Sequence, residues 1–197
     1  MRHVHLGRLI LALALLAAPA AAQLLPSSMQ YLAPVSDVSC SGWLREPYAT
    51  TNMYLNIDEG SADGGTTYIW ISGTTATASC EVKIGPALDP VSNTQHWIAA
   101  DFFVTTSGSC GTTVNLDLMQ GTTVIATHSV TSPAWWGTWS GVQLTTTQAD
   151  SISDYGDLRL RFRYTPSARC VSYTFYVTWG AVQIPSDPRT QRVMQVQ

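Results

Sequence analysis

The most distinctive side chains of the sequence lie in one short loop, where Trp135, Trp136 and Trp139 occupy three of five positions. Exposed indole faces stack on sugar rings and bury apolar C–H surface at little conformational cost. Alternatively, Trp136 and Trp139 pack beneath an edge of the fold, which leaves Trp135 as the better candidate for exposure. The loop therefore predicts either a glycan contact or a structural edge.

A second candidate site is a row of three arginines at alternate positions, Arg159, Arg161 and Arg163. Guanidinium groups fork onto carboxylate or sulfate, so Arg161 and its neighbours could recognise an anionic glycan. The alternative is cross-strand pairing with acids such as Asp101 or Asp117, each pair contributing a few tenths of a kcal/mol. The sequence favours the pairing.

Three acids, Asp58, Glu59 and Asp63, surround a Gly-rich turn and could ligate calcium through oxygen. Their spacing does not match an EF-hand loop, and a solvated acidic turn is the favoured alternative. Asp58 and Glu59 are adjacent, and neighbours on a strand point to opposite faces. They do not form the facing carboxylate pair that glycoside hydrolysis requires.

Catalysis has little support elsewhere in the sequence. Beyond the first 22 residues the only histidines are His96 and His128, and no GxSxG or HExxH motif is present. His128 shares one phase of an alternating segment with apolar residues, and His96 begins another segment beside Trp97. Both patterns favour structural hydrogen bonds. The sequence therefore predicts a protein that is not an enzyme and needs no cofactor beyond a structural calcium ion.

The first 22 residues resemble a secretory signal peptide. Two arginines precede the apolar run Leu9–Leu16, and small residues lead to a cleavage site between Ala22 and Gln23. A transmembrane anchor would need about 20 apolar residues, and Pro19 interrupts this shorter run. We therefore expect a secreted protein, extracellular or periplasmic, with no membrane span after cleavage.

Export changes how the four cysteines are interpreted. In an oxidising compartment Cys40, Cys80, Cys110 and Cys170 form an even set that predicts two disulfides. No CxxC pair is present, so a zinc site is not expected. Three pairings are possible, and the placement of the cysteines favours Cys40–Cys80 with Cys110–Cys170, the latter two at hairpin tips.

Composition narrows the class of protein. The 197 residues suit one domain of ordinary size, only 12% are charged, and the formal net charge is -3. No basic cluster is available to follow a phosphate backbone, so nucleic acid is not an expected partner.

Alternation with period two dominates the middle of the chain and indicates strands with one buried face. One further segment, 97–104, is apolar on both faces, as expected of a central strand. The fold predicted is all-β: an antiparallel two-sheet sandwich, with jelly-roll order, about nine strands and one short helical turn at 147–155. The clearest alternating segments are 53–58, 114–118, 158–164 and 171–179.

The domain borders follow from these patterns. Residues 1–22 are the signal peptide, 23–33 an N-terminal leader, 34–185 the β-sandwich domain and 186–197 a polar C-terminal tail. The alternating pattern slips after Trp179, and Gly180 is expected to mark a β-bulge there.

Several short motifs occur in an order and spacing that resemble a β-sandwich module common in phage tail and virion-surface proteins and in uncharacterised bacterial proteins. The resemblance implies a jelly-roll-like module for surface display or attachment, with no catalytic residues to transfer. The signal peptide and the four cysteines depart from that pattern and favour a secreted bacterial version. The motifs are Pro34–Ser39, Gly42-Trp43, Tyr54–Glu59, Asp89-Pro90 with His96, Gln120–Ala126, Gln148–Asp150, Asp154-Tyr155 and Asp157–Phe162.

Two functions remain from the sequence. The first is a secreted, non-catalytic module for surface attachment that binds a polysaccharide or a cell-surface glycan. The second is a structural subunit of an extracellular filament, sheath or virion-like assembly, whose partners are copies of itself. In that case the leader 23–34 or the tail would add a strand to a neighbour's open sheet edge.

Overall fold

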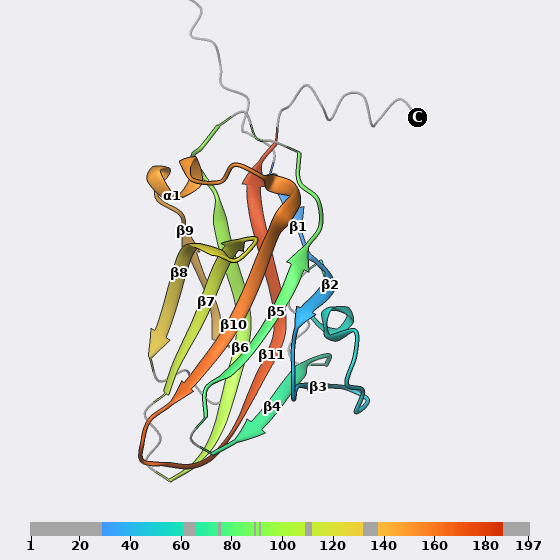
Figure 1. Cartoon of the computed structure of the whole chain (residues 1–197), viewed down its shortest axis with the longest axis vertical. Helices are drawn as coiled ribbons and strands as arrows, with labels where there is room; N and C mark the ends of the chain where they lie inside the picture. The colour runs from blue at the N-terminus through green and yellow to red at the C-terminus, as the bar shows by residue number, and fades with distance from the viewer. Residues whose placement is uncertain are drawn as a thin grey trace, which may run out of the picture.

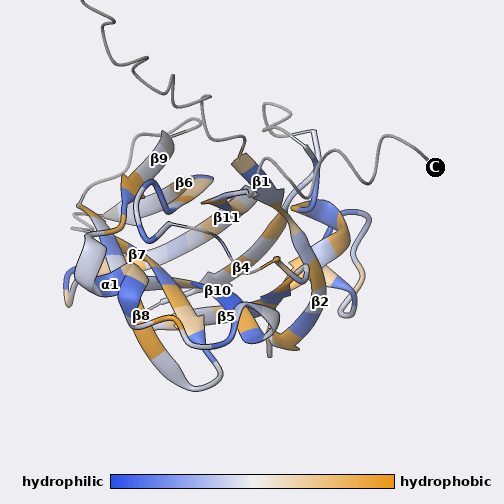
Figure 2. Cartoon of the chain, turned by 90° about the horizontal axis from the view of Figure 1, so that it is seen from above, coloured by the Kyte–Doolittle hydropathy of each residue, from blue (hydrophilic) through white to orange (hydrophobic). Residues whose placement is uncertain are grey.

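The computed structural model describes residues 29–60, 66–74, 76–88, 90, 92–108, 112–131 and 138–186. Two antiparallel sheets pack face to face, one of six strands and one of five (Figure 1). From above they form two layers (Figure 2). The all-β, two-sheet sandwich predicted from the alternating pattern is therefore confirmed, with eleven strands in the described part of the chain.

The six-stranded sheet has the order β3-β4-β11-β6-β9, with β1 also paired to β11, and the five-stranded sheet has the order β2-β5-β10-β7-β8. The strands are β1 Met29–Leu32, β2 Pro34–Ser39, β3 Leu44–Arg45, β4 Ile69–Gly73, β5 Ala78–Ile84, β6 Trp97–Gly108, β7 Thr112–Gln120, β8 Thr123–Thr131, β9 Thr138–Gln143, β10 Leu158–Pro166 and β11 Cys170–Pro185.

The eight strands from β4 to β11 follow jelly-roll order. One sheet carries β4-β11-β6-β9 and the other carries β5-β10-β7-β8, so the chain crosses between the sheets at most connections. This arrangement places the last strand, β11, in the middle of its sheet between β4 and β6. The jelly roll expected from the sequence is the topology observed.

The sandwich begins before residue 34, the border predicted for the domain. Strand β1 lies in the predicted leader, and it pairs with the C-terminal end of β11, with Met29 opposite Pro185. This strand has only four residues and one fully buried side chain, Leu32, so its alternation is too short to detect. The predicted signal peptide, and the tail beyond Ser186, lie outside the described residues. No helix within the described ranges is long and apolar enough to cross a membrane.

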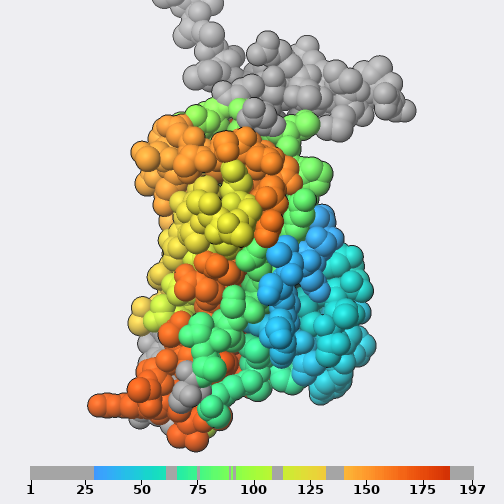
Figure 3. Space-filling model, in the orientation of Figure 1, coloured from blue at the N-terminus to red at the C-terminus, as the bar shows by residue number. Residues whose placement is uncertain are grey.

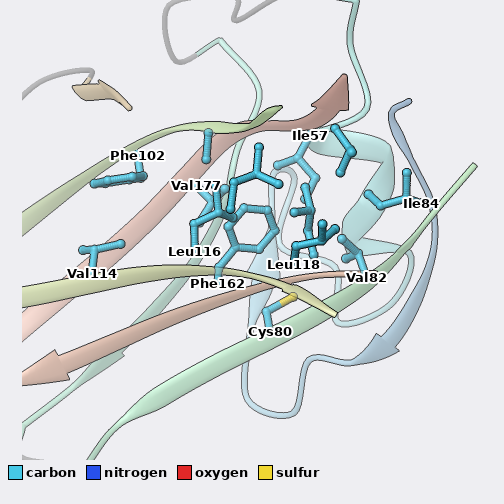
Figure 4. Close-up of a cluster of buried hydrophobic side chains, with 14 of the residues drawn as sticks. Ile57, Cys80, Val82, Ile84, Phe102, Val114, Leu116, Leu118, Phe162 and Val177 are labelled. Carbon is cyan, nitrogen blue, oxygen red and sulfur yellow. The ribbon is translucent and has the colours of Figure 1, made fainter. Parts of the chain in front are cut away.

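The core lies between the inner faces of the two sheets and contains most of the alternating apolar residues predicted from the sequence (Figure 4). Phe102 and Val177 come from the six-stranded sheet, and Leu116, Leu118 and Phe162 come from the other. All five are almost completely buried. Truncating such a side chain typically costs about 2–5 kcal/mol, so this layer holds the two sheets together. The segment 53–58, predicted as a strand, is instead a 3-10 helix at Met53–Asn56, which buries Met53 and leaves Leu55 exposed.

The predicted helical turn at 147–155 is present as two shorter elements. Helix α1, Thr146–Asp150, begins at Thr145, whose side chain and that of Gln148 form a reciprocal capping box. A single 3-10 turn, Tyr155–Asp157, follows and is capped by Asp154. The two turns carry the chain into β10.

The irregularity predicted at Gly180 lies two residues earlier. The register of β11 against β6 shifts between Val177 and Trp179. Gly180 is required for a different reason: a Cβ atom there would lie 2.7 Å from the ring of Phe162. The missing side chain lets the two sheets approach closely at this point.

Cys40 and Cys80 form the disulfide that their placement favoured, and it joins the end of β2 to β5. Cys170 is also disulfide-bonded. Cys110 lies outside the described residues, so the Cys110–Cys170 pairing stays a prediction. A disulfide is compatible with the oxidising compartment expected for an exported chain.

The outer face of the five-stranded sheet is organised around one buried carboxylate, that of Asp117 on β7. It accepts hydrogen bonds from Arg161 Nε at 2.9 Å, Arg163 Nε at 2.6 Å and Thr127 Oγ1 at 2.7 Å. Burial alone would raise the pKa of Asp117, but the hydrogen bonds from Arg163, Thr127 and Arg161 outweigh it and hold the pKa below its usual value. The carboxylate is therefore charged in the folded chain at neutral pH.

Replacing this carboxylate should destabilise the fold. Asp117→Asn leaves two guanidinium groups without their buried anion, and we expect the free energy of unfolding to fall by about 3 kcal/mol at neutral pH. Asp157→Asn is the matched control, because Asp157 is more exposed and its pair with Arg159 should contribute at most about 1 kcal/mol. Urea unfolding measures both values, and equal losses would contradict the role given to Asp117.

The same carboxylate predicts a pH dependence. A pKa lowered in the folded state means that its contribution is fully present above about pH 4 and is lost as the pH falls through the lowered value. Between about pH 5 and pH 2, the wild-type chain should therefore lose more stability than Asp117→Asn. Parallel losses in the two proteins would show that Asp117 is not a major acid-labile group.

Candidate functional site

The outer face of the six-stranded sheet carries a row of large apolar side chains that crosses four strands. Tyr176 on β11 lies directly opposite Trp70 on β4 and opposite Phe103 on β6, and Leu44 on β3 continues the row beyond Trp70. Directly opposite residues of antiparallel strands project on the same face. The inner-facing neighbours Phe102 and Phe175 belong to the core, so this row faces away from it.

Two of the rings in this row stack on each other, and two further tyrosines contact the row. Phe103 and Tyr176 are stacked with centroids 4.2 Å apart, and Tyr68 meets Tyr176 edge-on at 5.5 Å. Tyr48 meets Trp70 edge-on at 6.3 Å. We call these five residues, Tyr48, Tyr68, Trp70, Phe103 and Tyr176, the aromatic face. Four of them are half-buried, and Tyr48 is 74% exposed.

Tyr48 is held out by a tight turn between β3 and the following loop. Arg45 and Ala49 exchange both backbone hydrogen bonds across the turn, at 2.9 and 3.0 Å. The backbone of Tyr48 adopts φ 48°, a left-handed conformation that is uncommon for a bulky residue. Such strain persists only where the surrounding structure enforces it, and it concentrates at functional positions. The turn thus presents an aromatic ring to solvent at a conformational cost.

A buried amide fixes this turn against β4. Asn56 is only 5% exposed, and its Nδ2 donates to the carbonyl of Glu46 at 2.8 Å and to that of Tyr68 at 3.3 Å. Its Oδ1 accepts from Nη1 of Arg45 at 3.3 Å. Asn56 therefore connects the turn that carries Tyr48 to the segment that carries Tyr68, and positions both rings.

Hydroxyl groups lie next to the aromatic face, one step further along the same strands. Ser72, Thr174 and Thr105 form the adjacent cross-strand row, with 2.7 Å between the hydroxyls of Ser72 and Thr174. Beyond it, the hydroxyls of Ser107 and Ser172 are also 2.7 Å apart. The open part of this face therefore combines aromatic rings with short polar groups that can donate or accept hydrogen bonds.

On the opposite side of the aromatic row the face is more closely covered. Asp101 is 5% exposed; its Oδ2 accepts from the Thr178 hydroxyl at 2.9 Å, and its Oδ1 is buried without a hydrogen-bond partner. The next residue across is Trp179, which packs against Tyr31, and both rings donate to the carbonyl of Glu59. Burial raises the pKa of Tyr31 to about 12, so its hydroxyl keeps its proton at neutral pH.

The structure separates the binding residues predicted from the sequence. Trp135 and Trp136 lie outside the described residues, and Trp139 belongs to β9 with its Cα opposite that of Asp101. Arg161 lies on the outer face of the other sheet, where Nη2 is 2.8 Å from Oδ2 of Asp117. The pairing that the sequence favoured for Arg161 is present, and a role of Arg161 in ligand binding stays a prediction.

The predicted calcium ligands are only partly described. Glu59 Oε1 accepts a hydrogen bond from the Thr67 hydroxyl, and its Oε2 is buried without a partner. Asp58 precedes it, and Asp63 lies outside the described residues. Within the described ranges no group of three or more His, Cys, Asp or Glu residues could hold a metal ion. The calcium site stays a prediction.

Both histidines make hydrogen bonds inside the protein. His96 Nε2 lies 2.9 Å from the hydroxyl of Tyr155, and His128 Nε2 contacts the Ser140 hydroxyl. Burial lowers the pKa of each imidazole, which favours the neutral form. These contacts fit the structural role that the sequence predicted for them.

Comparison with solved structures yields weak similarities. A structure described as Family 16 Carbohydrate Binding Module-2 shares 18% identity over 62% of this chain and 79% of that chain, with a TM-score of 0.39. TmCBM61 in complex with beta-1,4-galactotriose shares 12% identity over 81% and 90% of the two chains, with a TM-score of 0.33. The apo form of a cyclase from Fischerella sp. shares 14% over 85% and 93%, with a TM-score of 0.37.

No protein-family model and no curated protein matches the chain. At these identities and TM-scores, the likeness to solved structures adds nothing to the sandwich already described. The resemblance to phage tail and virion-surface modules stays a prediction.

Sequence patterns did not identify the aromatic face, because its residues come from four separate segments of the chain. Two signals point to it in retrospect. Tyr176 is an aromatic residue in the polar phase of an alternating strand, and Phe103 lies in a strand that is apolar on both faces. The first signal suggests an exposed ring, and only the pairing of the strands brings the two rings together.

Two substitutions distinguish the exposed ring from the group that positions it. Tyr48→Ala keeps a Cβ atom, so the backbone strain is unchanged, and we expect the free energy of unfolding to change by at most about 0.5 kcal/mol. Asn56→Ala removes the side-chain donor to the carbonyl of Glu46 and one of two donors to the carbonyl of Tyr68, and should cost about 1–3 kcal/mol. Denaturant unfolding measures both. A Tyr48→Ala loss as large as that of Asn56→Ala would show that Tyr48 is part of the core packing.

Proposed function

We propose that the chain is a secreted, non-catalytic jelly-roll module that attaches to surfaces by binding glycans through the aromatic face. The observation that carries the proposal is a set of five aromatic residues on the solvent side of a sheet, in two contacting groups that lie on adjacent strands, with Tyr48 74% exposed. Sugar rings present apolar C–H surface to aromatic groups and hydroxyls at their periphery. The aromatic row and its hydroxyl neighbours have the matching composition.

The arrangement of the rings suits an extended ligand. Neighbouring strands lie about 4.8 Å apart, so Trp70, Tyr176 and Phe103 follow one another across the sheet at that spacing. A linear glycan lying across the strands would contact these three residues in succession. The hydroxyl row of Ser72, Thr174 and Thr105 runs parallel to it and would accept or donate hydrogen bonds along one side of the chain.

The proposal includes Trp135 and Trp136 of the tryptophan-rich segment before β9 as further ligand contacts. The loop precedes β9, and the first residue of β9, Thr138, lies opposite Phe102, the neighbour of Phe103. The chain therefore enters the six-stranded sheet beside the aromatic face. Trp135 and Trp136 lie outside the described residues, and we propose them as further glycan contacts because of their chemistry.

Binding measurements on variants test the proposal. An aromatic stacking contact contributes about 0.5–1.5 kcal/mol beyond area burial, so Tyr48→Ala and Trp135→Ala should each weaken binding by several-fold to about tenfold. Val124→Ala is the control, because Val124 is exposed on the other sheet and should leave the affinity unchanged. A glycan array would identify the ligand, and calorimetric titration would give the affinities.

Two outcomes would contradict the proposal. One is an affinity that falls with Val124→Ala but not with either aromatic variant. The other is a chain that binds no glycan and forms concentration-dependent polymers in size-exclusion chromatography, which would favour the filament, sheath or virion-like subunit. Strand β1 already pairs with β11 of its own chain, so the part of the leader that the structure describes is engaged within the fold.

A further inference from the structure

Charge is distributed unequally between the two outer faces of the sandwich. Between residues 29 and 186 the sequence contains six basic residues, and four of them, Lys83, Arg159, Arg161 and Arg163, lie on β5 and β10. These strands belong to the five-stranded sheet, which faces the viewer in Figure 3. The basic side chains are therefore on the side away from the aromatic face.

The arginines of that sheet form ion pairs with acids of the protein. Arg161 and Arg163 both bind the buried carboxylate of Asp117, and Nη1 of Arg159 lies 2.9 Å from Glu81 Oε1. All three guanidinium groups are thus held by acids within the protein, which reduces the positive charge that this surface offers to an anionic ligand.

The two remaining basic residues in this range do not direct their guanidinium groups toward a ligand on the aromatic face. Arg45 on β3 directs Nε to the carbonyl of Thr51 at 2.9 Å and Nη1 to Asn56. Arg169 lies in the turn that joins β10 to β11, at the end of the sandwich. The internal segments for which no structure is described, among them 61–65 and 132–137, contain neither Lys nor Arg.

Acids, by contrast, adjoin the aromatic face on both sides. The hydroxyl of Tyr68 lies 3.5 Å from Glu46 Oε2, and Tyr68 contacts Tyr176 directly. Asp101 occupies the position two residues before Phe103 on the same face of β6. Among the described residues, a ligand on this face would therefore meet these two acids and no cation. The carboxylate of Asp101 is buried and acts at low effective dielectric, where its field is strong.

We infer that the aromatic face takes uncharged glycans and discriminates against glycans that bear carboxylate or sulfate groups. The inference rests on the proposed function and narrows its ligand class. An anionic substituent is repelled by Glu46 and Asp101 and has no guanidinium partner among the described residues of this face, whereas the uncharged hydroxyl groups of a neutral sugar meet no such repulsion.

Matched polymers that differ in charge test the inference. Hydroxyethyl cellulose and carboxymethyl cellulose share a backbone, and the same comparison applies to any neutral polysaccharide that binds and to its sulfated derivative. Affinity electrophoresis at low ionic strength should show the anionic form bound at least about fivefold more weakly. Raising the salt to about 0.5 M should narrow this difference and leave the affinity for the neutral form unchanged.

A charge variant locates the effect. Glu46→Gln should reduce the discrimination and keep the affinity for the neutral polymer, whereas Asp157→Asn, which removes an acid from the other sheet, should leave both affinities as they are. Equal responses of the two variants would contradict the inference, because they would show that discrimination reflects net charge alone.

The remaining outcomes separate this inference from the proposed function. Anionic polymers that bind as tightly as neutral ones, or more tightly, would overturn the inference and leave glycan binding intact. No binding of either form would overturn the proposed function and the inference together. A dimer in sedimentation velocity that Tyr48→Ala dissociates would also overturn both, since the aromatic face would then bind a second copy of the chain.

Discussion

The register of β11 against its two neighbours is the constraint on which the rest of the molecule depends. Jelly-roll order places this strand between β4 and β6, so each residue from Tyr173 to Val177 is opposite one residue on either side. Phe175 and Val177 then face the core, and Tyr176 faces outward between Trp70 and Phe103. A shift of one residue would exchange the two faces and bury the binding row. The core and the proposed site are thus specified by the same pairing.

The half of β11 that follows its register shift contributes to the same outer face and core. Past the register shift, Trp179 packs on Tyr31, and both side chains donate a hydrogen bond to the carbonyl of Glu59. These contacts cover the edge of β11 between its pairing with β4 and its pairing with β1. Gly180 lets Phe162 of the opposite sheet approach. One end of the outer face is thereby covered, whereas the other end keeps its aromatic and hydroxyl rows open.

How far the sequence predicts this structure depends on how local each feature is. Alternation is a local property, so the sandwich and most inward residues of β10 and β11 follow from it. Export predicted oxidised cysteines, and their placement along the chain predicted the Cys40–Cys80 pairing. The aromatic face depends on strand pairings between distant segments, which periodicity does not contain. The exposure of Tyr48 is still harder to predict from the sequence, because it results from a strained turn that Asn56 fixes through hydrogen bonds to two backbone carbonyls.

The central claim is that a glycan binds at the aromatic face, and the most direct measurement is a titration followed by ¹H–¹⁵N NMR of the tryptophan indoles. With a neutral oligosaccharide identified by array screening, the account predicts a saturable shift of the Trp70 indole resonance, assigned by its loss in Trp70→Phe. The resonance of Trp43, which is buried in the core and donates to the carbonyl of Ser79, should stay unchanged. Saturable shifts at other resonances without any change at Trp70 would contradict the account.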